Sequence, residues 1–93
     1  MAKLGGITLA EQRGLYSMPQ KAASAWCAVE DIVGAGYKPL VFVGTQPVKG
    51  TNYHFIAEQT LITKTPIRHI VKIAINEFNG EYEVVKNSIE TIY

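Results

Sequence analysis

The side chains of this 93-residue chain that could support catalysis are one cysteine and two histidines. Cys27 could act as a nucleophilic thiolate if His54 or His69 served as its base. Its neighbour Trp26 belongs to the apolar stripe of a predicted helix, which places Cys27 at the edge of that stripe, and no spacing brings a base beside it. A lone cysteine more commonly behaves as a small apolar residue. We therefore predict that the chain is not an enzyme.

Binding of metals, phosphates or nucleic acids is also not indicated by the sequence. The two histidines lack the spacing of metal ligands. The glycines of Gly34-Ala35-Gly36 follow a predicted helix, whereas those of a phosphate-binding loop open one. Nine Lys and Arg against eight Asp and Glu give a net charge of +1, with no basic run. We expect no cofactor, no metal and no nucleic-acid partner.

The composition is that of one folded domain. With 47% hydrophobic and 18% charged residues, the chain is unlike a disordered segment. A chain of this length buries roughly 60% of its unfolded surface, enough for one core, so we expect a single domain over residues 1–93. The longest apolar stretch, residues 40–43, is too short to span a membrane. The N-terminus lacks the apolar region of a signal peptide, which predicts a cytoplasmic protein if no leader has been removed.

The most regular pattern is that of one amphipathic helix. Ser17 and Gln20 have the spacing of a capping box, and Pro19 falls in the first turn, where its missing N–H costs nothing. Gly34 and Gly36 are expected to end the helix. Apolar residues recur at three- and four-residue steps and form one stripe: Ala22, Ala25, Trp26, Val29, Ile32 and Val33.

After the helix the hydrophobic period changes from that of a helix to that of a strand. Strands are predicted at residues 40–43, 53–62 and 67–76, with a fourth carrying Tyr82, Val84, Val85, Ile89 and Ile92 and a short extra strand at residues 7–11. In the third strand one face is formed by Ile67, His69, Val71, Ile73 and Ile75. A lone helix and a sheet must each bury one face. The predicted fold is α+β, with a single N-terminal helix packed on a curled four- to five-stranded antiparallel sheet.

Three connections between the predicted strands carry turn residues. Asn79-Gly80 predicts a type I′ hairpin, because both central positions of that turn need positive φ. Residues 63–66 form a second connection, and residues 47–52 a third with Gly50 as its pivot. In an antiparallel sheet the third connection and the Asn79-Gly80 turn lie at one end, and residues 63–66 lie at the other.

One of these connections carries a recognisable motif. Gln46-Pro47-Val48-Lys49-Gly50 fits the pattern Gln-x-Val-x-Gly, and Thr51-Asn52-Tyr53 follows it directly. This combination resembles the first hairpin loop of the cystatins. Gly5 and Gly6 resemble the N-terminal trunk of that family, and the Asn79-Gly80 hairpin occupies the place of its second loop. The order of elements is similar over nearly the whole chain, and compact bacterial relatives are closer to it than animal inhibitors.

The resemblance implies reversible inhibition of papain-like cysteine proteases. In cystatins the trunk and the two loops fill the active-site cleft and offer no cleavable bond. Carried over, Gly50 permits a tight turn, Val48 offers an apolar contact and Gln46 holds the loop by hydrogen bonding. Gly50→Glu is then expected to abolish binding with little change in melting temperature. The implied protease-binding residues are Gly5, Gly6, Gln46, Pro47, Val48, Lys49, Gly50, Phe78, Asn79 and Gly80.

The second loop departs from the family pattern. Where cystatins often carry a Pro-Trp pair, this chain has Phe78 and Tyr82, and its single tryptophan, Trp26, belongs to the helix. An alternative hypothesis is therefore a non-inhibitory protein-binding or assembly module that keeps the cystatin-like fold and uses a sheet edge or the hairpin loops. Either a monomer or a domain-swapped dimer is compatible with the sequence.

Overall fold

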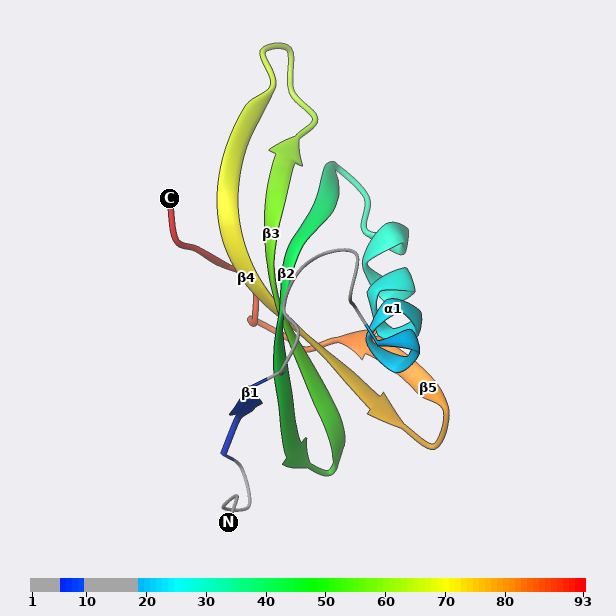
Figure 1. The fold of residues 1–93 in the computed structure, drawn as a ribbon. Helices are drawn as coiled ribbons and strands as arrows, with labels where there is room; N and C mark the ends of the chain where they lie inside the picture. The colour runs from blue at the N-terminus through cyan, green and yellow to red at the C-terminus, as the bar shows by residue number, and fades with distance from the viewer. Residues whose placement is uncertain (1–5, 10–18) are drawn as a thin grey trace.

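The computed structural model describes residues 6–9 and 19–93, which form a short strand, one helix and a large sheet (Figure 1). The helix α1 (Gln20–Trp26) continues directly into the 3₁₀ turn η2 (Cys27–Asp31). The strands are β1 (Thr8–Leu9), β2 (Ala35–Val48), β3 (Gly50–Leu61), β4 (Ile67–Phe78), β5 (Glu81–Val84) and β6 (Glu90–Thr91). This is the predicted α+β arrangement of one helix and an antiparallel sheet.

The strands lie in the sheet in the order in which the chain forms them, β1-β2-β3-β4-β5, and every pair is antiparallel. β6 pairs with a part of β4 that β5 does not reach. The described sheet has six strands, one more than the upper end of the predicted range. The difference arises because the last predicted strand is split. Asn87 adopts a φ of 62°, and the chain turns there between β5 and β6.

Ser88 occupies the edge of β4 between these two short strands. Its hydroxyl accepts a hydrogen bond from the N–H of Ala74 at 3.2 Å and donates one to the carbonyl oxygen of Ala74 at 3.1 Å. The N–H of Val85 also donates to the carbonyl oxygen of Ala74, at 2.9 Å. Val85 and the Ser88 side chain together satisfy the main chain of Ala74, so no bare edge is left at this point.

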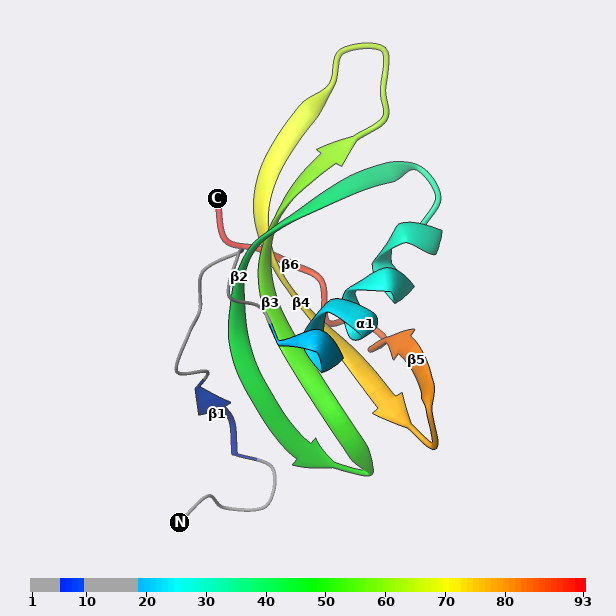
Figure 2. The same cartoon turned by 45° about the vertical axis from the view of Figure 1, so that its right-hand side comes forward.

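The sheet curves around the helix. The pairing of β2 with β3 shifts register twice, between Pro39 and Val41 and again between Phe42 and Gly44. Such bulges bend a strand and increase its twist. Figure 2 shows β2, β3 and β4 curving together, with α1 on the inner side of the curve. The predicted curled sheet is therefore observed, and the bulges of β2 account for part of its curvature.

The helix is shorter than its apolar pattern predicts. It begins at Gln20, directly after Pro19, and the predicted cap Ser17 lies outside the described residues. After Trp26 the chain tightens into η2 and then becomes extended at Ile32. The helical period is lost at this point, so Val33 is 95% exposed and its predicted place in the apolar stripe is wrong.

The core lies between α1 and the inner face of the sheet, with Phe55 at its centre. Phe55 is fully buried. Trp26 packs edge-on against it with ring centroids 5.1 Å apart, and the ring of Phe42 lies 5.4 Å away. The other core residues come from the helical stripe and from alternate strand positions: Ala22, Ala25, Val29, Tyr53, Ala57, Val71, Ile73 and Ile75. The period-2 prediction for the inner face of β4 is confirmed at Val71, Ile73 and Ile75, whereas Ile67, predicted on the same face, lies beyond the core and is exposed.

Several strand boundaries differ from the predicted ones. β2 is much longer than residues 40–43, and the predicted loop at residues 47–52 lies within β2 and β3 except for Lys49. β3 ends at Leu61, so Ile62 lies beyond it and is exposed. Of the predicted strand at residues 7–11, the described part forms β1. Hydrophobic periodicity located the buried centres of strands but not their ends, because cross-strand hydrogen bonds extend the ladders beyond the core.

Replacement of Phe55 by alanine tests the central packing. We expect Phe55→Ala to lower the free energy of unfolding by about 3–5 kcal/mol, because it opens a cavity beside Trp26 and Phe42. The matched control is Phe78→Ala, since Phe78 is 41% exposed, and we expect it to cost less than about 1 kcal/mol. Urea denaturation of both variants measures the difference. Equal losses would show that Phe55 is not central to the core.

Candidate functional site

Two hairpin turns and the N-terminal strand lie at one end of the sheet (Figure 2). A turn at Lys49 joins β2 to β3, and a turn at Asn79-Gly80 joins β4 to β5. β1 runs antiparallel to β2, which places Gly6 toward the same end. Residues 63–66 lie at the opposite end, as predicted. Gly5 lies outside the described residues.

The first turn is tighter than the predicted loop. Val48 pairs with Gly50, so Lys49 alone forms its tip. Gly50 has a φ of +83°, a conformation that glycine adopts without the strain of a side chain. A Cβ atom at this position would also overlap the carbonyl oxygen of Glu77 in β4. The fold therefore requires glycine here, and the prediction that Gly50→Glu would leave the melting temperature nearly unchanged is wrong.

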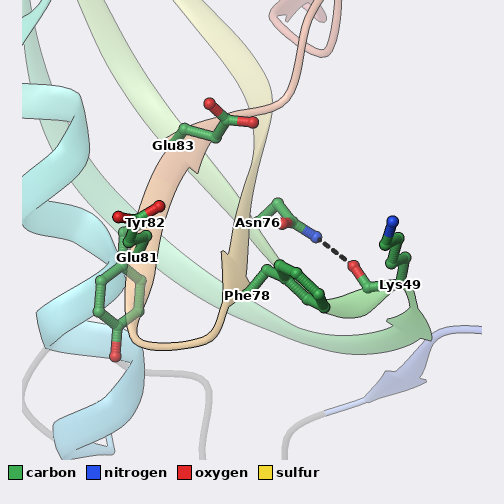
Figure 3. Close-up of a pocket in the computed structure, with 6 residues that line it drawn as sticks. All are labelled: Lys49, Asn76, Phe78, Glu81, Tyr82 and Glu83. Carbon is green, nitrogen blue, oxygen red and sulfur yellow. Dashed lines mark hydrogen bonds between the residues drawn. The ribbon is translucent and has the colours of Figure 1, made fainter.

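Side chains on β3 and β4 hold this turn from outside. The amide of Asn76 donates to the carbonyl oxygen of Lys49 at 3.1 Å (Figure 3) and to Oδ1 of Asn52 at 2.9 Å. The ammonium group of Lys49 lies 5.4 Å from the ring centroid of Phe78, within range of a cation–π contact. Lys49 is thereby attached to β4 through both its main-chain carbonyl group and its side chain.

The second turn has the predicted backbone conformation. Asn79 and Gly80 have φ values of 54° and 81°, both positive as a type I′ turn requires. Oε2 of Glu77 accepts a hydrogen bond from the N–H of Gly80 at 3.0 Å. Phe78 stands at the base of the turn with its ring partly exposed. This turn is therefore held by a carboxylate on the strand that leads into it.

Gln46 and Pro47 lie in β2 and not in a loop. The side chain of Gln46 hydrogen-bonds to Nε2 of His54 at 2.8 Å, with its Oε1 as the acceptor. This contact ties β2 to β3 behind the turn, away from its tip. Of the motif residues predicted to contact a protease, Val48 and Lys49 are exposed, and Val48 presents 38% of its surface to solvent.

A groove of about 640 Å³ lies beside the two turns (Figure 3). The side chains that line it are Lys49, Asn76, Phe78, Glu81, Tyr82 and Glu83. Sequence reasoning identified Lys49, Phe78 and Tyr82 for this end of the sheet but missed Asn76, Glu81 and Glu83. The sequence did contain a signal for most of these residues, because alternate residues of a strand share one face. Phe78 pairs with Glu81, and Asn76 pairs with Glu83, so the tight turn predicts that all four lie together.

Of the residues considered for catalysis, His54 lies behind the first turn, hydrogen-bonded to Gln46, whereas His69 pairs with Gln59 farther along β3. The thiol of Cys27 donates to the carbonyl oxygen of Ala23 at 3.6 Å, and no histidine among the described residues hydrogen-bonds to it. Burial lowers the pKa of His54, and the charge of Lys72 lowers that pKa further. Within residues 6–9 and 19–93, no group of three or more His, Cys, Asp and Glu side chains has an arrangement that could hold a metal ion.

Comparison with protein-family models, curated proteins and solved structures finds no significant match to this chain. In the described part of the chain, α1 is far too short to cross a bilayer, and no other helix there could do so. The geometry of the turns and their surroundings is therefore the basis for assigning a function.

The requirement for glycine at the first turn can be measured against the second turn. Gly80 also has positive φ, but a Cβ atom there would meet no neighbouring atom within 4 Å. We expect Gly80→Ala to cost about 1–2 kcal/mol of unfolding free energy from backbone strain alone. Gly50→Ala should cost distinctly more, because the collision with Glu77 is added. Denaturant unfolding of both variants gives the comparison, and equal losses would contradict the close approach to β4.

The lowered pKa of His54 predicts a pH dependence of stability. Because the folded chain disfavours the protonated imidazole, unfolding takes up a proton at pH values between the folded pKa and the ordinary value of 6.5. The free energy of unfolding should therefore fall as the pH drops from about 7.5 to about 5.5. His54→Gln should flatten this slope while keeping an amide near Gln46. A variant with the parent's slope would show that another group is responsible.

Proposed function

We propose that this chain is a reversible inhibitor of papain-like cysteine proteases and that the end of the sheet with the two turns enters the protease cleft. The observation that carries the proposal is the order of three segments at that end: β1 with Gly6, then the Lys49 turn, then the Asn79-Gly80 turn. In the cystatins, which the Gln-x-Val-x-Gly motif resembles, the trunk and two loops are used in this order.

The side chains at this end suit a contact surface. Val48 and Phe78 expose apolar surface without joining the core, and Lys49 adds a charge at the narrow tip of the first turn. Apolar and aromatic side chains of this kind provide most of the affinity in compact protein interfaces. Because the turns are short and hydrogen-bonded, little conformational entropy would be lost on binding.

Inhibition of this kind requires no covalent chemistry and no cofactor. Neither turn has to present an extended peptide bond to the catalytic cysteine, because each reverses the chain within a few residues. The turns would exclude substrate by filling the cleft, and release would restore an intact protease. Phe78 takes the place where cystatins often carry a Pro-Trp pair, so it would supply the apolar contact of the second turn.

The groove beside the turns favours a second candidate function, a non-inhibitory protein-binding module. Its lining combines the ring of Phe78 with the charges of Lys49, Glu81 and Glu83, which could receive a loop or side chain of a partner protein. This module would use the same end of the sheet. The two functions differ in whether the surface fits the active-site cleft of a protease.

Titration of papain activity with the purified chain and two valine variants tests the proposal. We expect reversible inhibition by the parent. Val48→Glu should weaken it roughly a hundredfold, because a carboxylate would be placed in the enclosed cleft. Val33→Glu is the matched control. Val33 is also exposed but lies next to Gly34, whose carbonyl oxygen hydrogen-bonds to Ile62 toward the opposite end of the sheet.

Each outcome of this titration decides between the candidates. Inhibition that is lost only in Val48→Glu supports entry of the first turn into the cleft. Inhibition that is weakened equally by both variants would place the contact elsewhere. A parent that does not inhibit papain at high concentration would refute the proposal for this class of protease and favour the binding module.

A further inference from the structure

Two consecutive residues of β4 hold the turns: Asn76 contacts the first turn, and Glu77 contacts both. Neighbouring residues of a strand point to opposite faces of the sheet. Asn76 hydrogen-bonds to the main chain of the first turn, and Glu77 hydrogen-bonds to the main chain of the second. One short piece of strand therefore holds both turns, although they belong to different hairpins.

The contacts of Asn76 use the full donor capacity of its amide. The two hydrogens of an amide nitrogen can serve two acceptors at once. Here the acceptors are the carbonyl oxygen of Lys49 and Oδ1 of Asn52, which lies directly opposite Asn76 in the ladder. An aspartate would present only acceptors to these two oxygens, so the interaction depends on the amide itself.

Glu77 contacts both turns, one through its side chain and the other through its main chain. Its carboxylate accepts the N–H of Gly80 in the second turn, and its carbonyl oxygen lies against Gly50 in the first turn so closely that no side chain fits between them. The contact between Lys49 and Phe78 adds a third connection between the hairpins. The two turns cannot move far from each other without breaking these contacts.

We propose that Asn76 and Glu77 brace the two turns into one rigid binding edge before a partner arrives, and that Asn76 is a positioning residue that acts through the carbonyl group of Lys49. The part of the proposal that concerns protease binding rests on the proposed function. The bracing itself is a property of the free chain and can be measured without any protease.

The reason for a brace is entropic. Fixing the backbone of a flexible residue at the moment of binding costs affinity, and a turn that is already ordered avoids that cost. Lys49 lies beyond the last buried pair of the core, Tyr53 and Ile75, so burial does not immobilise it. Asn76, which is 27 positions away from Lys49 in the sequence, supplies the missing restraint by donating a hydrogen bond to the carbonyl oxygen of Lys49.

The test compares Asn76→Ala with Ser88→Ala in the full chain. Each substitution removes two side-chain hydrogen bonds, so the two losses of unfolding free energy should be similar. The Ser88 side chain bonds to Ala74 in β4 and contacts neither turn, which makes Ser88→Ala the control. Backbone ¹⁵N relaxation of the free proteins and inhibition of papain are measured for both. Asn76→Gln, which keeps the amide but displaces it by one methylene, serves as a second variant in case Asn76→Ala does not fold.

In Asn76→Ala we expect the order parameter of the Lys49 amide to fall from about 0.85 to below about 0.6. The inhibition constant should rise roughly tenfold. Asn76→Gln should change both in the same direction, and Ser88→Ala should change neither. A Lys49 amide that stays rigid in both Asn76 variants would overturn the brace, whatever happens to inhibition.

The two proposals fail in different ways. If the parent does not inhibit papain but Asn76→Ala loosens Lys49, the brace is supported and the proposed function is refuted. If Asn76→Ala inhibits less well while Lys49 remains rigid, Asn76 touches the protease directly and its role as a positioning residue is refuted.

Discussion

The ring of Phe55 is the point at which the separate parts of this fold meet. Trp26 reaches it from the helix, and Phe42 reaches it from β2. A helix of seven residues is unstable alone in water, so α1 depends on this contact for its existence. The contact in turn depends on a sheet that curves toward the helix, and the bulges of β2 on either side of position 42 favour that curvature. Packing and curvature therefore stabilise each other.

Beyond the core, hydrogen bonds replace burial as the stabilising interaction. Tyr53 and Ile75 form the last buried pair toward the two turns, and the next pair along the ladder is Asn52 with Asn76. The amide nitrogen of Asn76 donates to Oδ1 of Asn52 and to the carbonyl oxygen of Lys49 in the first turn, so polar contacts stabilise this position where apolar side chains would be exposed. Gly50 lets the first hairpin lie directly against β4. This end of the sheet can thus remain ordered while its tips stay open to a partner.

The use of hydrogen bonds in place of burial at this end of the sheet has a functional consequence. A binding edge must expose apolar side chains, yet exposed apolar side chains in a flexible loop lose entropy when they bind. Here Phe78 and Val48 are exposed on strand ends whose backbones are already paired. Both candidate functions, protease inhibition and non-inhibitory protein binding, use this property. What separates them is the shape of the partner's surface, because the same edge could enter a cleft or receive a protruding loop.

Local preferences determined much of this structure from the sequence alone. The helical stripe up to Val29, the buried face of β4 and the Asn79-Gly80 turn were all predictable, because each depends on periodicity or on the φ of a few adjacent residues. Val33 was misplaced, since periodicity does not show where a helix tightens into a 3₁₀ turn. Only the tertiary structure decided the bulges of β2, the closeness of Gly50 to β4 and the bond from Asn76 to the first turn. Each of these joins segments that are distant in the sequence, and their approach is set by how the whole sheet curves around the helix.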